Sequence, residues 1–420
     1  MSRQRVSRHQ SLGYTEAMTH KLYYDDPLQT EFDARVTDVS QWKGKYRVVL
    51  DRTCFYPEGG GQPADTGFLS DIPVVDVRKE HSTIYHITEQ APPADEVHGR
   101  VDGQHRRDYM QQHTGQHIIS GAMMEIDEIP TISVHQGEEY TTIEVERSSL
   151  DGRTLEAIED RANAIIAQNR AVNTFLAKEG DVPSLGLRRP PKVSGEIRIV
   201  EIDEFDRVAC GGVHTVRTGD VRLAKLVGTE TIRGNVRTAW KIGDRAFRDY
   251  RQKSEIVAEL NDLLSAQNHE ITERIRALQE NHRQVEYKNR ALESRIAALM
   301  AQELAERADK IEMGRIVTGT FHGEDKNIIR KVVESLVEHE NTYAAIVNIE
   351  AERVLWSLAC SPELSVDFNV MKDKLLPVIN GKGGGRHPIW QGAGSRLDSV
   401  AEFHEEFKRL IASGSGRKEK

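Results

Sequence analysis

Two short pairs of metal-binding side chains constrain the fold of this 420-residue chain more than any other feature. His113 and His117 lie in HTGQH, and Cys210 and His214 lie in CGGVH. Three imidazoles and one thiolate make a complete tetrahedral set for zinc, whereas neither pair could close such a site alone. The motifs therefore predict one Zn²⁺ per chain and a fold that brings two remote segments of one domain together.

The local sequence around each pair supports this prediction. The histidines have i, i+4 spacing in a stretch expected to be helical, so both rings would leave one face about one turn apart. Gly211 and Gly212 would let Cys210 and His214 converge from a tight turn. A histidine pair on an amphipathic helix can also be an ordinary surface pair, and only the combination favours a metal. HTGQH lacks the glutamate of a metalloprotease helix, and the sequence has no Pro-Cys-x-x-Cys of a deaminase.

The composition is that of an ordinary globular protein, with 38% hydrophobic and 29% charged residues. The net charge of −9 argues against a generic polyanion binder. No apolar run reaches the ~18 residues of a membrane span, and residues 1–20 show no secretory signal, so we expect a cytoplasmic protein without a membrane partner. Three widely spaced cysteines favour reduced thiols over a disulfide framework, and Cys54 and Cys360 are expected to be inert.

Residues 21–103 alternate short β-rich runs with turn signals, which predicts a small barrel or sandwich. Within them, FYPEGGGQPADTG carries Gly59, Gly60 and Gly61 in succession. Consecutive glycines cost backbone entropy, so the chain must need positive φ or a close approach there. A tight hairpin would explain them, and so would a loop facing a ligand; the sequence leaves both open.

Residues 104–245 predict an α/β domain that carries the metal site. A helix is expected from about residue 104, a strand pair near 131–145, an amphipathic helix over 154–169 and a strand over 196–203. The apolar stripe of the second helix comprises Leu155, Ile158, Ala162, Ile165 and Ile166. Basic residues gather at two places, Arg188, Arg189 and Lys192, and Arg222 to Lys253, including Arg233, Arg237, Lys241, Arg245 and Arg248. They could hold a phosphate backbone, or form a solvated face balanced by acids.

Residues 246–313 predict a helical arm, because neither glycine nor proline occurs from Asp244 to Met313. Apolar residues recur there every seven positions, as in a coiled-coil seam. They are Tyr250, Val257, Leu264, Ile271, Leu278, Val285, Leu292 and Leu299. The companion positions are mostly polar, so a helical hairpin broken near Asn268, or a helix packed on a neighbour, is favoured over a long uninterrupted dimer.

Residues 314–420 predict a compact mixed α/β unit of three strands and three helices. Between its last two helices, GKGGGRHPIWQGAG is expected to be a loop. Exposed backbone NH groups would make a phosphate nest, reinforced by Lys382, Arg386 and His387, and Trp390 could stack on a base or sugar. This pattern favours contact with nucleic acid.

Four motifs in a fixed order resemble one known family. HTGQH and CGGVHTVRTGD, preceded by FYPEGGGQPADTG and followed by a helical arm and GKGGGRHPIWQGAG, resemble the freestanding alanyl-tRNA editing proteins in their long form. These are relatives of the editing and C-terminal domains of alanyl-tRNA synthetase, and the resemblance spans residues 21–395. It implies a zinc-dependent hydrolase that deacylates alanine tRNA mischarged with serine or glycine and so protects translation fidelity. No Asp-His-His motif or class II synthetase core is recognised, so neither phosphoester cleavage nor aminoacylation is expected.

The resemblance also implies roles for individual residues. The family's metal ligands fall on His113, His117, Cys210 and His214, and its glycine-rich motif falls on Gly59, Gly60, Gly61 and Gln62. Thr53 lies near the position that contacts the serine hydroxyl in relatives. The C-terminal loop, Lys382, Gly383, Gly384, Gly385, Arg386 and His387, corresponds to a domain shared with DHH-type phosphoesterases that grips tRNA and can dimerise. As a departure, Gly115 follows Thr114 inside the helix, at a cost of ~1 kcal/mol relative to Ala.

The expected fold class is therefore α+β, in five parts. They are a flexible tail (1–20), a β-barrel-like domain (21–103), a zinc-binding editing domain (104–245), a coiled-coil-like helical arm (246–313) and a mixed α/β, DHH-associated domain for tRNA binding and dimerisation (314–420). The expected partners are mischarged alanine tRNA and a second copy of the chain.

Gln62, Thr53 and Cys210 are the predicted catalytic residues. A site that satisfies buried polar groups with the serine hydroxyl can reject alanine, and Thr53 and Gln62 are the predicted readers of that hydroxyl. Four protein ligands fill a tetrahedron, so either one ligand, such as His214, is displaced, or zinc only organises the pocket. A zinc-stabilised tRNA-binding protein without catalytic activity is the alternative function.

Overall fold

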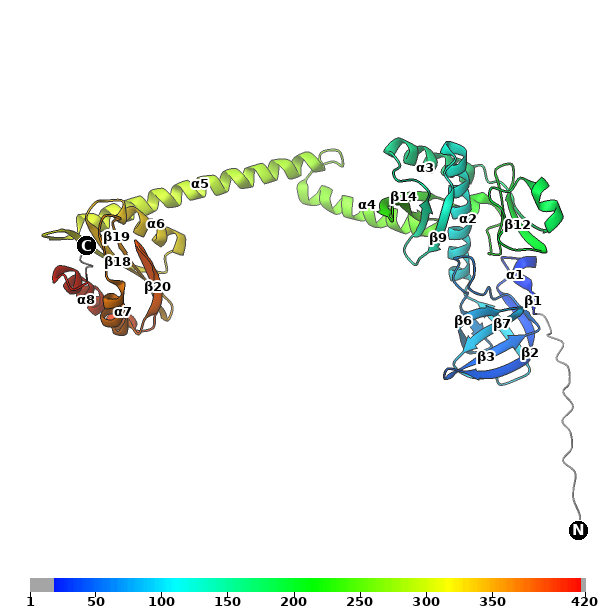
Figure 1. The fold of residues 1–420 in the computed structure, drawn as a ribbon, viewed down its shortest axis with the longest axis horizontal. Coiled ribbons are helices and arrows are strands. Elements are labelled where there is room, and N and C mark those ends of the chain that lie inside the picture. The colour runs from blue at the N-terminus through cyan, green and yellow to red at the C-terminus, as the bar shows by residue number, and fades with distance from the viewer. Residues whose placement is uncertain (1–18, 417–420) are drawn as a thin grey trace, which may run out of the picture. The chain divides into compact units, whose positions relative to one another are not determined.

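The computed structural model describes residues 19–416, which form a mixed α+β protein with several sheets (Figure 1). Its contacts divide the chain into two compact units, with the boundary between Glu259 and Leu260. The predicted tail lies outside the described residues except for its last two positions. Of these, Thr19 is buried and donates a hydrogen bond to the Leu50 carbonyl at 2.8 Å. Among the described residues, no helix combines the length and the apolar character needed to cross a membrane.

The first part of unit 1 is a closed six-stranded barrel, one of the two architectures expected. Its strands, in order around the barrel, are β2 (Glu31–Trp42), β3 (Lys45–Leu50), β7 (Thr83–Thr88), β6 (Ile72–Glu80), β5 (Gly67–Leu69) and β8 (Glu96–Val101). Alternating apolar residues such as Val48, Val77 and Ile84 fill its interior. Before the barrel, β1 (His20–Lys21) and α1 (Leu22–Asp25) lead into it, and β1 pairs in parallel with β4 (Arg52–Thr53).

The second part of unit 1 packs two helices on a four-stranded sheet. The helices are α2 (Gly103–Asp127) and α3 (Gly152–Ala167), and the sheet order is β14 (Ala224–Ile232), β15 (Asn235–Ile242), β10 (Thr141–Val145) and β9 (Thr131–Gln136). Four of the five predicted stripe residues of α3 are fully buried against them, and Leu155 is half-buried. A separate sheet joins β11 (Val172–Lys178), β12 (Glu196–Ile202) and β13 (Asp206–Ala209), with short 3-10 helices at Glu179–Leu185 and Thr218–Val221.

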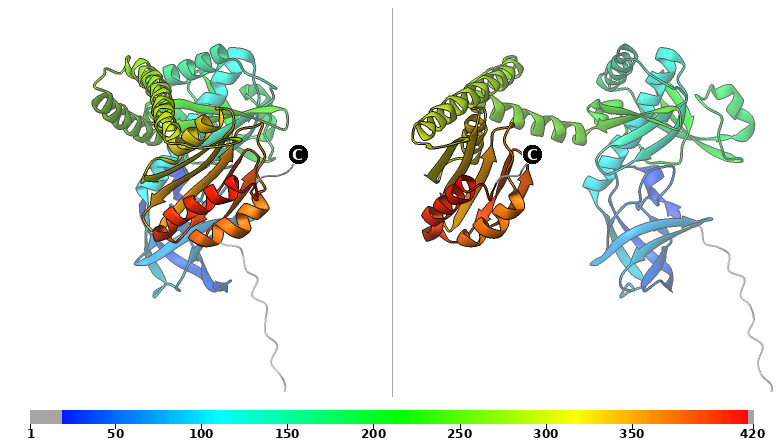
Figure 2. Two further views of the ribbon diagram at one scale, coloured as in Figure 1. Left: turned by 90° about the vertical axis from the view of Figure 1, so that its left-hand side faces the viewer. Right: turned by 60° about the vertical axis from the view of Figure 1, so that its left-hand side comes forward.

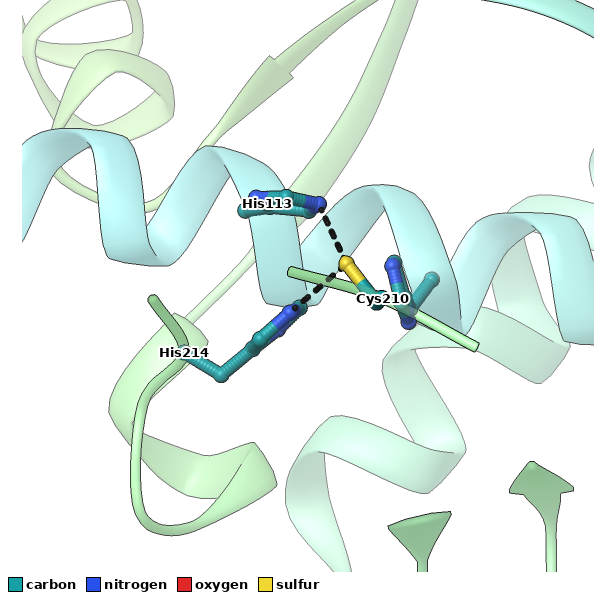
Figure 3. Close-up of side chains that lie close together, drawn as sticks. His113, Cys210 and His214 are labelled. Atoms are coloured by element: carbon teal, nitrogen blue, oxygen red, sulfur yellow. Dashed lines mark hydrogen bonds between the residues drawn. The ribbon is translucent and has the colours of Figure 1, made fainter. Parts of the chain in front are cut away.

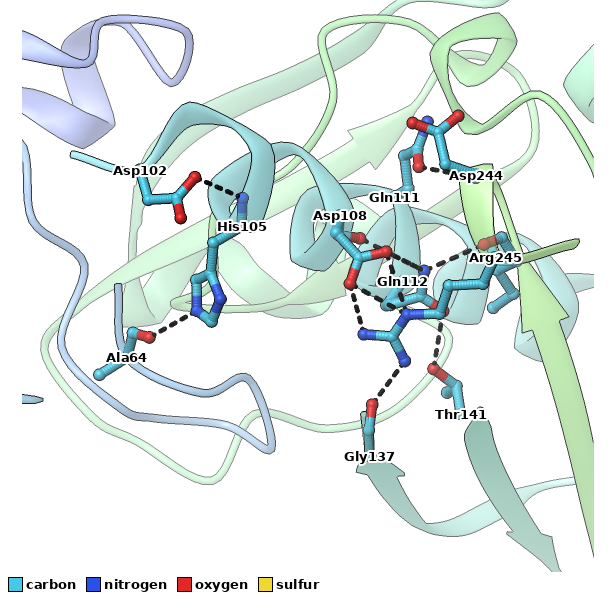
Figure 4. A network of polar contacts seen from close by, with 11 residues as sticks. Ala64, Asp102, His105, Asp108, Gln111, Gln112, Gly137, Thr141, Asp244 and Arg245 are labelled. Atoms are coloured by element: carbon cyan, nitrogen blue, oxygen red, sulfur yellow. Dashed lines mark hydrogen bonds and ion pairs between the residues drawn. The ribbon is translucent and has the colours of Figure 1, made fainter. Parts of the chain in front are cut away.

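Helix α2 is held by polar contacts over its first three turns, which fix the face that carries His113 and His117 (Figure 4). Asp102 caps its first turn by accepting from the backbone NH groups of Gln104 and His105. Further along, Asp108 pairs with Arg245, and the Gln112 side chain donates to the Ile242 carbonyl at 3.0 Å. Because α2 is surrounded by protein, most of its residues are buried, polar ones included.

Gly115 corrects the expectation that a glycine merely loosens this helix. A Cβ at Gly115 would lie 2.5 Å from Ile242 Cγ2 and 3.1 Å from Val221 Cγ1. The glycine therefore lets α2 approach β15 closely, and this packing offsets the weaker helix propensity.

The predicted arm consists of α4 (Asp244–Leu264) and α5 (Ile271–Glu306), and Asn268 lies in the break between them as expected. Four of the five seam residues of α5 are exposed, Leu278 62%, Val285 63%, Leu292 57% and Leu299 60%, and Ile271 is half-buried. Near its C-terminal end, α5 packs through Ala297 and Ala301 on the sheet and on α6 (Lys326–Val337) of its own unit, unit 2.

Unit 2 contains a six-stranded sheet with helices on both faces (Figure 2). The strand order is β16 (Asp309–Ile311), β17 (Gly314–His322), β18 (Thr342–Glu350), β19 (Arg353–Cys360), β21 (Ile389–Gly394) and β20 (Lys382–Arg386). α5 and α6 (Lys326–Val337) cover one face, and α7 (Phe368–Leu375) and α8 (Val400–Ala412) cover the other. Short 3-10 helices occupy Leu376–Ile379 and Leu397–Ser399.

The glycine-rich segment of unit 2 is a β-hairpin rather than the expected loop. Lys382–Arg386 and Ile389–Gly394 pair antiparallel as β20 and β21. A Cβ at Gly383 or Gly392 would lie 2.5 Å from Trp356 Cζ2, so these glycines make room for an aromatic ring beneath the hairpin. β20 is the edge strand of the sheet and pairs only with β21, so its alternate backbone groups lie outside the ladder. The extended backbone of a strand is not the concave turn of a phosphate nest, so the structure has an open strand edge there instead of the expected nest.

Candidate metal centre

The two predicted pairs converge on one point. One ligand atom from each of His113, His117, Cys210 and His214 lies within 4.8 Å of the others. Cys210 Sγ is 3.3 Å from His113 Nε2 and 3.4 Å from His214 Nε2 (Figure 3). A tetrahedral site with bonds of about 2.0 Å to nitrogen and 2.3 Å to sulfur places its ligand atoms about 3.5 Å apart. The cluster could therefore bind one metal ion with little rearrangement.

Gln62 fixes the orientation of the His113 ring. Its Oε1 accepts from the backbone NH of Val213 at 3.1 Å, which identifies this atom as the oxygen. The same oxygen lies 2.8 Å from His113 Nδ1, so that ring nitrogen must carry the proton and donate. His113 Nε2 is then left with its lone pair directed at the cluster, the tautomer that a metal ligand needs.

Gln62 is delivered to the cluster by the run of three glycines. Gly59 and Gln62 exchange two backbone hydrogen bonds of 3.1 Å, closing a two-residue turn at Gly60 and Gly61. Both turn residues have positive φ, +62° and +87°, which glycine adopts without strain. The structure confirms the tight hairpin, and it leaves a ligand-facing role as a prediction, because the turn buries Gln62 beside the four clustered side chains.

Two side chains hold the turn Cys210–Gly212 by donating hydrogen bonds to its three backbone carbonyls. Arg198 donates to the carbonyls of Cys210 and Gly212, both at 2.9 Å, and Tyr24 donates to the Gly211 carbonyl at 2.8 Å. A Cβ at Gly212 would lie 2.1 Å from His113 Cε1 and 2.9 Å from Gln62 Oε1. Neither glycine of this turn has positive φ. Gly212 is therefore required for lack of a side chain, not for the backbone freedom expected from the sequence.

The remaining two histidines differ in how firmly they are held. His214 Nδ1 lies 3.2 Å from Thr114 Oγ1, which also accepts from the backbone NH of Thr215. By contrast, His117 Nδ1 is buried and has no hydrogen-bond partner among the described residues. His117 is thus the least restrained of the three rings.

Burial prepares the cluster for a cation. Burial, with a smaller contribution from nearby Arg198 and Arg189, lowers the pKa of His113 to about 3. Burial also lowers the pKa values of His117 and His214 well below the usual range, so all three rings are neutral near pH 7. Burial raises the pKa of Cys210, against which the backbone NH of Gly212 acts. A bound cation would therefore have to displace about one proton, that of the thiol.

A buried ion pair anchors the hairpin segment to α2. Arg106, two turns before His113, pairs with Asp65, and each side chain is 2% exposed. Asp65 also accepts from the backbone NH of Tyr56 at 2.6 Å, and Arg106 donates to the carbonyls of Pro27 and Cys54. Separating the two side chains would leave a buried charge without a partner, which is strongly unfavourable. The pair therefore fixes how the barrel segment packs against α2.

Thr53 lies in the barrel interior and makes its contacts there. Its Oγ1 accepts from the backbone NH of Phe55 at 3.0 Å and lies 2.8 Å from His86 Nε2. His86 Nδ1 lies 3.0 Å from the Val48 carbonyl and must donate to it, so Nε2 accepts the Thr53 hydroxyl proton. The hydrogen bonds of the described residues do not join Thr53 to Gln62 or to the four clustered side chains.

The basic stretch from Arg222 to Lys253 is largely neutralised by acids. The residues in ion pairs are Arg222, Lys225, Arg237, Lys241, Arg245 and Lys253. Of the alternatives left open, the balanced face is therefore the better description. Arg188 pairs with Asp206 at 2.8 Å, whereas Arg189 is exposed and has no carboxylate partner among the described residues.

Some of the residues of unit 2 that were predicted to contact nucleic acid are exposed, and one is buried. Lys382, Arg386 and His387 are exposed, as a contact with RNA would require. Trp390 is not available for stacking on a base, because it is 5% exposed and its ring is stacked on Phe368 at 5.5 Å between centroids. The sequence pattern predicted an aromatic side chain available at the surface, but that side chain packs against Phe368 instead.

Sequence reasoning missed several residues that shape the centre. Thr114 lies inside the HTGQH motif, so its hydroxyl could have been recognised from the sequence as a candidate contact of the site. Tyr24, Arg198 and the pair Arg106–Asp65 act through carbonyls and a distant carboxylate, so no local spacing pointed to them.

Comparisons with known proteins agree with this arrangement. A family model described as "tRNA synthetases class II (A)" matches residues 2–105, and one described as "Threonyl and Alanyl tRNA synthetase second additional domain" matches residues 197–237. The second match contains Cys210 and His214. We expected no class II synthetase core to be recognised, and the first match runs against that expectation over residues 2–105, ending before HTGQH.

Curated relatives cover most of the chain. The alanine–tRNA ligases of Pyrococcus abyssi and Pyrococcus furiosus are 29% and 30% identical over 418 and 417 residues, covering 94% and 93% of this chain but 43% of each ligase. The chain thus spans less than half the length of these ligases. The alanyl-tRNA editing protein Aarsd1-A of Xenopus laevis is 28% identical over 376 residues, covering 88% of this chain and 89% of that protein.

One solved structure, the C-Ala domain from Aquifex aeolicus alanyl-tRNA synthetase, matches 25% of this chain and 97% of that domain, with 17% identity and a TM-score of 0.23, too low to support a conclusion about fold. The two family models and the curated relatives agree with one another and with the motif order. The chain is therefore similar to the alanyl-tRNA editing protein of Xenopus laevis and to part of the alanine–tRNA ligases.

Proposed function

We propose that this protein is a trans-editing hydrolase that cleaves the ester between a wrong amino acid and alanine tRNA, with serine and glycine as the amino acids removed. The observation that carries the proposal is the buried cluster of His113, His117, Cys210 and His214 with the Gln62 amide at its edge. The resemblance to the alanyl-tRNA editing protein of Xenopus laevis over nearly the whole length of that protein supports it.

We infer that the cluster holds one zinc ion, because three neutral imidazoles and a thiol at these separations suit its tetrahedral preference. His113, His117, Cys210 and His214 would be its ligands. When bound, zinc supplies a positive centre that can polarise an ester carbonyl or hold the amino group of the substrate.

Gln62 is suited to reading the substrate. Its oxygen is fully used by Val213 and His113, yet its Nε2 is buried and has no partner among the described residues. A buried donor without an acceptor costs free energy, so a ligand oxygen placed there gains the interaction that the free protein lacks. The serine hydroxyl is the oxygen that alanine does not have, which gives discrimination against alanine a physical basis.

Thr53 can contribute only in a limited way. Its proton goes to His86 and one lone pair accepts from Phe55, so the hydroxyl could only accept one further hydrogen bond. We therefore assign the reading of serine to Gln62 first and keep Thr53 as a supporting acceptor. Cys210 keeps its predicted place in the catalytic centre as the thiol ligand.

A substrate group could enter the cluster if one ligand gave way. His214 was the expected candidate, and the contact of its Nδ1 with Thr114 Oγ1 at 3.2 Å would restrain its ring. The unpartnered Nδ1 of His117 could itself be the atom that faces the cation, so it does not single out His117 as the ligand that yields.

We further propose that Lys382, Arg386 and His387, with the hairpin glycines Gly383, Gly384 and Gly385, contact tRNA. The exposed seam of α5 and unit 2 are the proposed dimer contacts. Because charged tRNA is consumed by translation, the cytoplasm is the proposed location.

The deciding experiment measures release of amino acid from seryl-, glycyl- and alanyl-tRNA(Ala) by the full chain and by Cys210→Ala. We expect release of serine and glycine, retention of alanine, and loss of both release and bound zinc in the variant. A wild-type protein that binds tRNA(Ala) and zinc but releases nothing would instead establish the alternative, a zinc-stabilised tRNA-binding protein.

A further inference from the structure

A surface pocket of unit 1 shares a wall with the turn that carries Cys210. It has a volume of about 400 Å³ and lies between the segment Thr19–Asp25 and strands β11 and β12. Two of its lining residues, Tyr24 and Arg198, are those that hold the carbonyls of Cys210, Gly211 and Gly212. The pocket therefore adjoins the metal centre through a single turn of backbone.

The walls of this pocket combine flat apolar surface with cations. Phe175 and Leu176 line it and are 36% and 63% exposed. Exposure of large apolar side chains to water is unfavourable and often marks a binding site. Lys21 Nζ and the Arg198 guanidinium lie over the Tyr24 ring, 5.5 Å and 4.4 Å from its centroid. An aromatic and aliphatic face next to positive charge is the combination that binds a nucleobase together with its phosphate.

Neither of the two cations of the pocket is held in an ion pair among the described residues. The ion pairs of the described residues include neither Lys21 nor Arg198, and Asp25, the acid in the lining, pairs with His20 at 2.7 Å. Burial lowers the pKa values of both Lys21 and Arg198, which reflects the cost of holding cations there without an anion. On a chain with a net charge of −9, such a site stands out locally as a place for an anionic group.

We propose that this pocket binds one unpaired nucleotide at the 3′ end of an RNA, with its base stacked on Phe175 and its phosphate at Lys21 and Arg198. The assignment of RNA as the source rests on the proposed function, whereas the nucleotide chemistry rests on the pocket. Occupancy would press on Tyr24 and Arg198 and so hold the Cys210 turn in place while the ester lies at the metal centre.

The test uses the full, zinc-loaded chain and a tetranucleotide ending in CCA that carries 2-aminopurine, whose fluorescence falls on stacking. Phe175→Ala should weaken binding about tenfold or more, since one base stacked on an aromatic side chain contributes roughly five- to hundredfold in affinity. Phe68→Ala is the matched control, because Phe68 is 38% exposed on a barrel strand and does not line the pocket. Lys21→Gln should reduce the salt dependence of binding by about one phosphate contact.

The outcomes separate this site from the proposed function. Unchanged tetranucleotide affinity and unchanged KM for seryl-tRNA in Phe175→Ala, with serine still released, would overturn the pocket assignment and leave the hydrolase intact. Tight binding that requires Phe175 in a protein that releases no serine would overturn the hydrolase and leave the pocket. Adenosine monophosphate that competes as strongly as the tetranucleotide would reassign the pocket to free nucleotides and overturn the RNA-end assignment.

Discussion

Replacing Gly212 with alanine should disable the metal centre while leaving the fold intact. The added Cβ would lie 2.1 Å from His113 Cε1 and 2.3 Å from His113 Nδ1, whereas ordinary contacts begin near 3.4 Å. The ring would have to move by about 1.3 Å (3.4 − 2.1), which is enough to break its 2.8 Å contact with Gln62. Loss of such an outer contact of a metal ligand typically costs 10- to 100-fold in affinity, and displacement of the ligand itself costs more.

Gly211→Ala is the matched control for this experiment. Its Cβ would meet only Tyr24 Oη, at 3.7 Å, and the residue does not have positive φ. Zinc affinity should be measured by competition with a chromophoric chelator, and serine release in the same samples, with the thermal midpoint as a check on folding. Zinc affinity and serine release should fall at least tenfold in Gly212→Ala and remain at the wild-type level in Gly211→Ala. Equal behaviour of the two variants would refute the steric argument.

Three further perturbations test separate parts of the structure. Gln62→His should impair serine release while the thermal midpoint stays within a few degrees, because it removes the free amide and the acceptor of His113; unchanged release would remove Gln62 from the proposed role. Gly115→Ala should destabilise the protein by about 1–3 kcal/mol despite the better helix former, because its Cβ meets Ile242 at 2.5 Å, and a higher denaturation midpoint would contradict this packing. Zinc binding should release about one proton near pH 7, because burial raises the pKa of Cys210 and keeps the histidines neutral, and zinc affinity should therefore rise with pH. Calorimetry in buffers of different ionisation enthalpy would count the released protons. A count near zero would mean that the thiol is not a ligand.

The four side chains that form the site could be predicted from the sequence, whereas most of the contacts that orient them could not. His113 and His117 follow from helical spacing, and Cys210 and His214 follow from a turn motif, so side-chain type and local geometry sufficed to expect the cluster. The contacts that orient those side chains come from Gln62 and Thr114, which act across 51 and 100 positions of sequence, and from Arg198, which acts across 12. Such contacts depend on how the barrel, α2 and β12 pack together, which no local pattern encodes.

Element prediction succeeded where a pattern repeats and failed where packing decides. The strands of residues 31–101, the stripe of α3 and the helix break near Asn268 follow from periodicity and its interruption. The family resemblance placed Thr53 near the substrate, and that stays a prediction; the contact of its hydroxyl with His86 had no sequence signal. Trp390 was expected at the surface, yet it completes an aromatic stack with Phe368 inside unit 2.

Glycine is where the sequence is most ambiguous, because it answers two different physical needs. At Gly60 and Gly61 the backbone requires positive φ, and a turn can be inferred from the run of glycines alone. At Gly212 and Gly383 the backbone is ordinary, and the need is for an absent Cβ facing His113 in one case and Trp356 in the other. The first need is local and readable from sequence, whereas the second becomes visible only when the partner ring is placed. A glycine-rich stretch next to cations, as in residues 381–394, therefore supports a phosphate site only after steric crowding by a neighbouring ring or strand has been excluded.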